Sequence, residues 1–212
     1  MNITYHIGDL PNDVKFIGSV AVDTEAMGLN VNRDRLCLVQ LSDADQNVHL
    51  VHFKPDTTYD APNLKRLMND PSVMKIFHFA RFDVMMIQAY LKVQVKSVYC
   101  TKIASYLTRT YTNKHGLKEL CKELLSVDLA KQEQTSDWGA ETLRPEQMEY
   151  AATDVIHLHK LKEKLDVVLR RENRTEIANN CFEFLNTRAL LDILGMAQDD
   201  IFAHSINPRT HS

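Results

Sequence analysis

FIGSVAVDTE, residues 16–25, reads as an apolar strand that runs directly into two acidic residues. Its β-branched and apolar residues predict a strand over Phe16 to Asp23. Side chains alternate between the two faces of a strand, so Asp23 and Glu25 project to one side and Thr24 projects to the other. Two carboxylates that emerge beside a core repel each other and are poorly solvated, and a divalent cation removes both problems. The pair therefore indicates a metal site at the end of a buried strand.

The residues around this strand predict an α/β fold with a mixed sheet, flanking helices and a helical C-terminus. Two more apolar stretches, Leu36 to Leu41 and Val48 to Phe53, follow across short polar turns, and three such strands predict an antiparallel meander. After Pro62 helices and strands alternate, which indicates that the rest of the sheet is parallel. The expected elements there are a helix over Leu64 to Asn69, a strand over Val73 to Phe77, a helix from about Arg81 to Tyr90 and an extended piece over Val95 to Val98. Beyond Thr101 we expect almost only helix, at Ile103 to Leu107, Leu117 to Leu124, Pro145 to Arg171 and Glu176 to Leu194.

Two more carboxylates, Asp83 and Asp154, lie on predicted helices. Asp154 falls within the apolar stripe of the long helix, and Tyr150 stands one turn earlier on the same face. An unpaired aspartate there costs several kcal/mol, so either a basic partner or a metal must meet it. Asp83 follows a buried strand in the first turn of a helix, where it is either another ligand or an acid favoured by the helix dipole alone.

The composition limits the partners. The chain has 212 residues, 25 lysines and arginines against 28 acids, and a formal net charge of -3. Without a basic excess, any contact with nucleic acid is expected to be short and local. Four scattered cysteines without a CxxC pair exclude a common zinc site, and no apolar stretch approaches the roughly 18 residues of a membrane span, so we expect a cytoplasmic protein.

Four segments together resemble the DEDDy class of 3′-5′ exonucleases, most of all the exonuclease domain of the ribonuclease D family. They are VAVDTEAMGLN at 20–30, HFARFD at 78–83, KQEQTSDWG at 131–139 and EYAATDVIHL at 149–158, and the resemblance runs from about Val14 to Lys164. It implies a ribonuclease H-like fold and the hydrolysis of nucleic acid from its 3′ end with release of 5′-mononucleotides. It also implies four metal ligands, Asp23, Glu25, Asp83 and Asp154, for two Mg²⁺ or Mn²⁺ ions. Hard oxygen ligands suit these ions.

The same resemblance suggests which residues meet the substrate. Tyr150 positions or deprotonates the attacking water. Met27, Gly28 and Leu29 meet the 3′-terminal nucleotide, although Met27 and Leu29 are about equally expected to cap the core. The other candidates are His78 and Arg81 beside Asp83, and Lys131, Gln134 and Trp138 in the third segment. A histidine that ends a strand is often structural, and a single tryptophan is equally often a packing anchor.

The length of the chain indicates which of the related exonucleases it resembles most. We expect an exonuclease domain over residues 1–170, a C-terminal helix over 171–195 that packs on the domain or forms an oligomer interface, and a polar tail over 196–212. This stand-alone size resembles the nanoRNase C oligoribonucleases, which implies single-stranded RNA substrates down to dinucleotides and a homo-oligomer such as a ring. The alternatives are a broader exonuclease that trims tRNA or single-stranded nucleic acid ends, and an inactive nucleic-acid-binding module.

Overall fold

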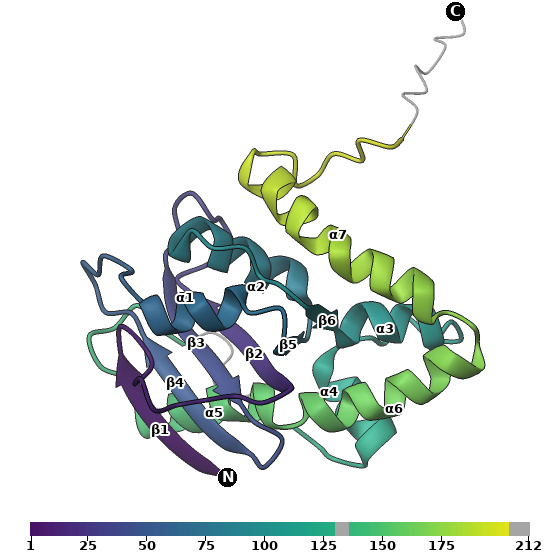
Figure 1. Ribbon diagram of the computed structural model, residues 1–212, viewed down its shortest axis with the longest axis horizontal. Coiled ribbons are helices and arrows are strands. Elements are labelled where there is room, and N and C mark those ends of the chain that lie inside the picture. The colour runs from purple at the N-terminus through teal and green to yellow at the C-terminus, as the bar shows by residue number, and fades with distance from the viewer. Residues whose placement is uncertain (130–135, 204–212) are drawn as a thin grey trace, which may run out of the picture.

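A computed structural model of the chain, which describes residues 1–129 and 136–203, contains one six-stranded mixed sheet with helices on both faces (Figure 1). The strand order is β1-β4-β3-β2-β5-β6. The strands are β1 (Asn2–Ile7), β2 (Ser19–Ala26), β3 (Leu36–Ser42), β4 (Asn47–His52), β5 (Met74–Phe77) and β6 (Val98–Cys100). The predicted α/β fold is confirmed.

The pairing directions agree with the two halves of the prediction. β2, β3 and β4 form the antiparallel meander, and β5 and β6 join it in parallel on the other side of β2. β3 is buried along its whole length, because it lies between two strands and beneath helices. The pieces expected over Val73 to Phe77 and Val95 to Val98 became β5 and β6, with β6 shifted toward Cys100.

The edge strand β1 was not predicted. It pairs in parallel with β4, with Asn2 opposite Asn47 and Ile7 opposite His52. The alternation of Ile3, Tyr5 and Ile7 with polar residues is the period-two signal of a half-buried strand. That signal was present in the sequence.

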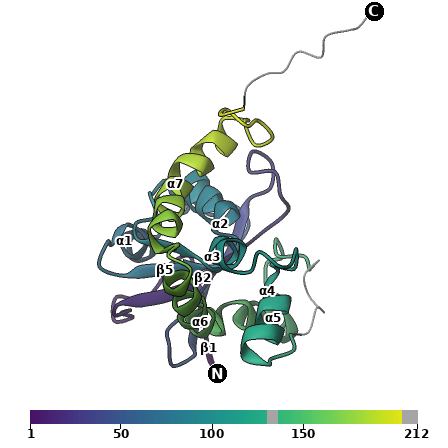
Figure 2. The same cartoon turned by 90° about the vertical axis from the view of Figure 1, so that its right-hand side faces the viewer.

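The helices form two layers, and a view turned by 90° shows α1 and α2 on one side of the sheet and α5 on the other (Figure 2). They are α1 (Pro62–Asn69), α2 (Ala80–Met86), α3 (Thr101–Thr108), α4 (Leu117–Leu120), α5 (Pro145–Ile156), α6 (Leu158–Arg171) and α7 (Thr175–Ile193). α2 and α4 each continue into a π-helical turn, over Ile87–Leu91 and Cys121–Leu125. No helix within the described ranges is both long and apolar enough to span a membrane.

The single helix predicted over Pro145 to Arg171 is wrong in one respect, because it bends at His157. The backbone there has φ −100° and ψ −10°, and α5 ends one residue earlier. α5 lies against β1 to β4, whereas α6 packs on α3, β5 and α7. The two halves face different surfaces, and packing on both overrides a straight helical pattern.

The C-terminal helix α7 packs on α2, α3, α6 and β6. It buries Phe182, Leu185 and Ala189, yet it leaves Ile177, Leu190 and Leu194 about half exposed or more. The helix therefore covers the domain with one face and carries apolar side chains on another.

Candidate active site

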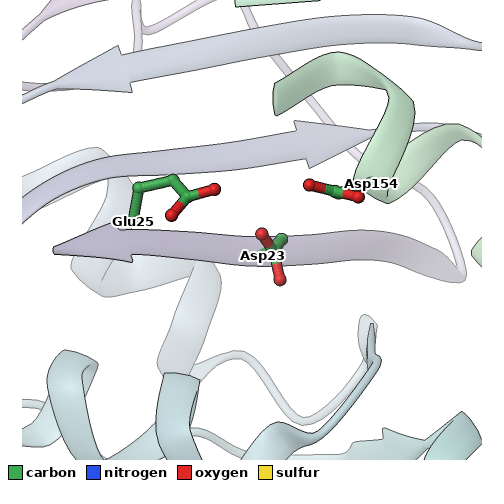
Figure 3. A group of neighbouring side chains, drawn as sticks. All are labelled: Asp23, Glu25 and Asp154. Atoms are coloured by element: carbon green, nitrogen blue, oxygen red, sulfur yellow. The ribbon is translucent and has the colours of Figure 1, made fainter. Parts of the chain in front are cut away.

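The two acids of β2 stand side by side at the end of the strand, as the alternation predicted (Figure 3). Asp23 lies opposite Gln40 of β3, and the Gln40 amide donates a hydrogen bond to Asp23 Oδ2 at 3.2 Å. Glu25 lies opposite Leu38, next to a bulge at Ala26. The meander thus holds both carboxylates on the same face of the sheet.

Asp154 reaches this pair from α5 across the sheet face. One carboxylate oxygen each of Asp23, Glu25 and Asp154 lies within 4.8 Å of the others. The three side chains point toward one another from a strand and a helix that are far apart in sequence (Figure 3). No lysine or arginine in the described part of the chain forms an ion pair with any of them.

Asp83 takes up a different position. It lies in the first turn of α2, is only 2% exposed, and accepts a hydrogen bond of 2.7 Å from the Thr24 hydroxyl, which projects from the other face of β2. Its charge nevertheless acts on Asp23 and Glu25. Asp83 is therefore beside the three-carboxylate group rather than within it, and its role as a ligand stays a prediction.

Burial and mutual repulsion raise the pKa of every acid in this region. Burial and then the Asp83, Asp154 and Glu25 carboxylates raise the pKa of Asp23 well above its ordinary value, and burial and then Asp154 do the same for Glu25. Burial raises the pKa of Asp83 to about 7 and that of Asp154 to about 7. The ionised carboxylates therefore destabilise the fold, and a bound divalent cation would offset this effect.

Tyr150 stands one helical turn before Asp154 on the same face of α5. Burial and then the Asp154, Glu25 and Asp23 carboxylates raise the pKa of the phenol above its ordinary value of 10.0. The hydroxyl is therefore protonated at neutral pH and donates hydrogen bonds. Trp138 packs beside it, with ring centroids 6.3 Å apart.

A cavity of about 460 Å³ opens over these residues. Asp23, Glu25, Asp154 and Tyr150 line it, and so do two lysines, Lys102 of α3 and Lys118 of α4. Neither lysine has an ion-pair partner among the described residues. The cavity combines a cluster of acids with free cations and is of the size of small-molecule sites.

The loop after β2 presents two apolar side chains to solvent. Met27 is 58% exposed and Leu29 is 83% exposed, and Leu29 lines the cavity. Between them a Cβ on Gly28 would lie 2.4 Å from Asp34 Oδ2, so this close approach requires glycine. The exposure disfavours the alternative that Met27 and Leu29 cap the core.

His78 lies at the end of β5 and lines the cavity as a neutral ring. Thr101 donates its single hydroxyl proton to the Phe77 carbonyl at 3.1 Å, so the 2.9 Å contact with His78 Nδ1 requires that Nδ1 be the donor. Burial and then Lys102 lower the pKa of His78 to about 3. His78 is therefore an uncharged residue of the cavity wall, tied to Thr101 through Nδ1.

Two candidate contacts, Arg81 and Trp138, do not line the acidic cavity. Arg81 forms a bidentate ion pair with Asp192 of α7, at 2.7 and 2.8 Å, and does not line the acidic cavity. Trp138 is 3% exposed, so the structure favours its alternative reading as a packing anchor. Lys131 and Gln134 lie outside the described residues.

Several residues of the site were missed by the sequence analysis. They are Thr24 and Gln40, which bond to the acids, and Phe79 and Lys102, which line the cavity. The strand alternation could have pointed to Thr24. The others come together only through the pairing of strands.

The sheet order and the acidic group are those of ribonuclease H-like 3′-5′ exonucleases, and comparisons with known proteins agree. Residues 7–170 match the family described as 3′-5′ exonuclease. A ribonuclease D of Gluconacetobacter diazotrophicus is 31% identical over 157 residues, which cover 74% of this chain and 39% of that protein. The chain thus spans about two fifths of the length of this curated relative.

Solved structures show the same likeness over nearly the whole chain. NrnC of Brucella melitensis with bound Mg²⁺ is 50% identical, with a TM-score of 0.92, over 97% of this chain and 100% of that one. NrnC bound to pGG matches with the same identity, TM-score and coverage. The chain belongs to the 3′-5′ exonuclease family, and within it to the DEDD exonucleases of the ribonuclease D type that are similar to NrnC. The predicted resemblance and enzyme class are confirmed.

Proposed function

We propose that this protein is a metal-dependent 3′-5′ exoribonuclease that acts on short oligoribonucleotides, down to dinucleotides, and releases 5′-mononucleotides. The observation that carries the proposal is the group of three carboxylates from β2 and α5 within 4.8 Å of one another, beside Tyr150 in an open cavity. Such a group of hard oxygen donors suits Mg²⁺ or Mn²⁺. The family membership and the Mg²⁺-bound NrnC structure support the same assignment.

Four acids would hold two divalent cations, namely Asp23, Glu25, Asp154 and, from α2, Asp83. When bound, such ions polarise the phosphate and stabilise the charge on the attacking and leaving oxygens. The chain's own groups supply the rest. The Tyr150 hydroxyl orients the water, whose oxygen bonds to the phosphorus of the 3′-terminal nucleotide while the bond to the preceding 3′ oxygen breaks. Asp154, one helical turn away on the same face of α5, orients the phenol by accepting from it.

The preference for short RNA rests on the size and charge of the site. The cavity of about 460 Å³ suits one or two nucleotides, and only Lys102 and Lys118 provide free cations on its described walls. A chain with a net charge of -3 binds a long polyanion weakly. The structure of the similar NrnC with pGG supports a dinucleotide-sized substrate.

The remaining parts of the proposal concern substrate contacts and assembly. Met27, Gly28 and Leu29 meet the 3′-terminal nucleotide, with Leu29 wedged against a base, and His78 contacts the substrate from the cavity wall. The apolar side chains that α7 leaves exposed, Ile177, Leu190 and Leu194, support self-association into a homo-oligomer. The enzyme acts in the cytoplasm.

The test is product analysis on 5′-labelled RNAs of two, five and twenty nucleotides with Mn²⁺, Mg²⁺ or EDTA. We expect metal-dependent release of mononucleotides, fastest from the dinucleotide. Stepwise shortening that is fastest on the 20-mer would instead indicate a broader trimming exonuclease. No cleavage of any RNA with either metal would leave a nucleic-acid-binding module.

A further inference from the structure

The loop that joins β2 to β3 is closed at its base by Arg35. The Arg35 carbonyl accepts a hydrogen bond of 3.1 Å from the Met27 amide, so the two ends of the loop over residues 27–35 are held together. The Arg35 side chain is half-buried, and no carboxylate in the described part of the chain forms an ion pair with it. A half-buried guanidinium group without a carboxylate needs other acceptors for its donors.

Those acceptors are backbone carbonyls of distant segments. Arg35 Nη1 donates to the Phe53 carbonyl, directly after β4, at 2.6 Å, and Arg35 Nη2 donates to the Gly139 carbonyl at 2.9 Å. The planar guanidinium group fixes the angle between these two donors. Arg35 thus joins the meander to a residue that lies 104 positions further along the chain.

The segment around Gly139 is also held by α5. The Gln147 side-chain amide donates to the Asp137 carbonyl at 3.1 Å, and the Trp138 ring packs beside the Tyr150 ring. The guanidinium group holds the same segment from the meander side. The segment therefore bridges the helix that carries the phenol of the site and the loop that follows the acids of β2.

Gly139 packs closely against Met27. A Cβ on Gly139 would lie 3.2 Å from Met27 Cγ and 3.4 Å from Met27 Cε. Gly139 does not have a positive φ, so this close approach, rather than the backbone conformation, favours glycine. The Met27 side chain is exposed, so Gly139 supports it on one side while another side faces solvent.

We propose that Arg35 is a positioning residue that sets the pocket for the base of the 3′-terminal nucleotide. Its guanidinium group holds Gly139 against Met27, and its carbonyl closes the loop that carries Met27 and Leu29. The inference deepens the proposed function and rests on it, because it takes this loop as the place of that nucleotide. Arg35 does not line the acidic cavity, so it acts through Met27 rather than by touching the substrate.

A pocket made of two exposed apolar side chains depends on what supports them. Methionine is unbranched and has three rotatable bonds, so its orientation depends strongly on its neighbours. Without the donor at Arg35, the Gly139 carbonyl loses its link to the meander, and the support beneath Met27 can shift. A displacement of about 1 Å at a positioning contact costs an enzyme up to roughly 10²-fold in rate.

The first experiment measures what the 3′ base contributes in the parent and in Arg35→Met. We compare kcat/KM for a 5′-phosphorylated diribonucleotide with that for the same compound lacking the 3′ base, so that the charge of the substrate stays constant. We expect the parent to favour the intact compound by at least about tenfold, and Arg35→Met to favour it by less than about threefold. On the compound lacking the base, kcat should differ by less than about threefold between the two proteins, because the acids and Tyr150 are unchanged.

Two further variants separate the planar guanidinium group from its charge and from a general link between the segments. Arg35→Lys keeps the charge, but a single ammonium group does not reproduce the fork that reaches two segments, so the ratio should stay below about fivefold. Glu141→Gln removes the ion pair of 2.9 Å between Lys54 and Glu141, which also joins the meander to this segment, and should keep the parent ratio. An equal loss in Glu141→Gln, or full recovery in Arg35→Lys, would refute the role of the guanidinium group.

The second experiment displaces Met27 without altering Arg35. Gly139→Ala places a Cβ against Met27 and should lower the ratio to less than about threefold with no change in charge, which provides the answer should Arg35→Met fail to fold. If the parent cleaves dinucleotides without favouring the intact compound, or if either variant folds and keeps the parent ratio, Arg35 has no such role while the exonuclease stands. If the parent cleaves no dinucleotide, the proposed function fails and this role fails with it.

Discussion

Each carboxylate of the site lowers the free energy of unfolding of the metal-free protein, and Asp154 illustrates the size of this effect. Its pKa of about 7, raised by burial, means that ionisation at pH 8 works against folding. We expect Asp154→Asn to increase the free energy of unfolding of the metal-free protein by roughly 1–3 kcal/mol, because a shift of one pKa unit corresponds to about 1.4 kcal/mol. The same variant should lose about a thousandfold in kcat, because it removes one of the proposed metal ligands. Denaturant unfolding in EDTA and a steady-state assay with Mn²⁺ measure the two effects, and a variant less stable than the parent would contradict the argument.

Tyr150 is expected to act on chemistry rather than on binding. Its raised pKa keeps the phenol protonated, so it orients water as a hydrogen-bond donor and acceptor. Tyr150→Phe should lower kcat by about 10²–10⁴-fold while KM changes by less than about threefold. The parent should be most active on the alkaline side of neutrality. Unchanged kcat in Tyr150→Phe would remove the phenol from the mechanism.

Among the helices, α7 holds α2 in place through one buried acid. Asp192, whose side chain is 4% exposed, accepts from Arg81 of α2 and from Arg188 one turn earlier on α7. Burial raises its pKa, but hydrogen bonds and charge from Arg81 and Arg188 prevail, so the pKa of Asp192 is below its ordinary value. Since α2 also carries Asp83, the contact links the C-terminal helix to the site.

This link predicts a stability effect with a clear control. Asp192→Asn should lower the free energy of unfolding by about 2 kcal/mol, because two guanidinium groups lose a charged acceptor. The control is Glu172→Gln, which removes the ion pair between Glu172 and Arg171, whose side chains are 38% and 71% exposed. It should change the free energy of unfolding by less than about 0.5 kcal/mol. Both values come from denaturant unfolding. Equal effects in the two variants would show that the buried Asp192 stabilises the fold no more than an exposed ion pair does.

For the molecule as a whole, the acidic group links pH, metal and stability. Asp83 and Asp154 titrate near 7 in the folded chain against an ordinary value of 3.8, so between about pH 4 and pH 7 the folded chain holds more protons than the unfolded one. The contribution of these groups to the free energy of unfolding therefore falls as the pH rises through that window. Protons also compete with a metal for the same oxygens.

We accordingly expect excess Mn²⁺ to raise the Tm by several degrees at about pH 8 and by much less at about pH 6. Thermal unfolding in Mn²⁺ against EDTA at both pH values measures the shift. The double variant Asp23→Asn with Asp154→Asn should lose it. A Tm that responds equally to Mn²⁺ in parent and double variant would place the bound ion elsewhere.

Strand alternation and helical spacing were sufficient to predict the meander, the parallel second half of the sheet, and the shared faces of Asp23 with Glu25 and of Tyr150 with Asp154. These features depend on local geometry, which repeats every two residues in a strand and every 3.6 in a helix. The bend at His157, the engagement of Arg81 by Asp192 and the burial of Trp138 depend on surfaces that meet across the fold. So does the contact between Arg35 and Gly139, because these residues become neighbours only when the segment before α5 packs on the meander. The chemistry of the site was therefore readable from spacing, whereas the surroundings that select a substrate arise from packing between distant segments.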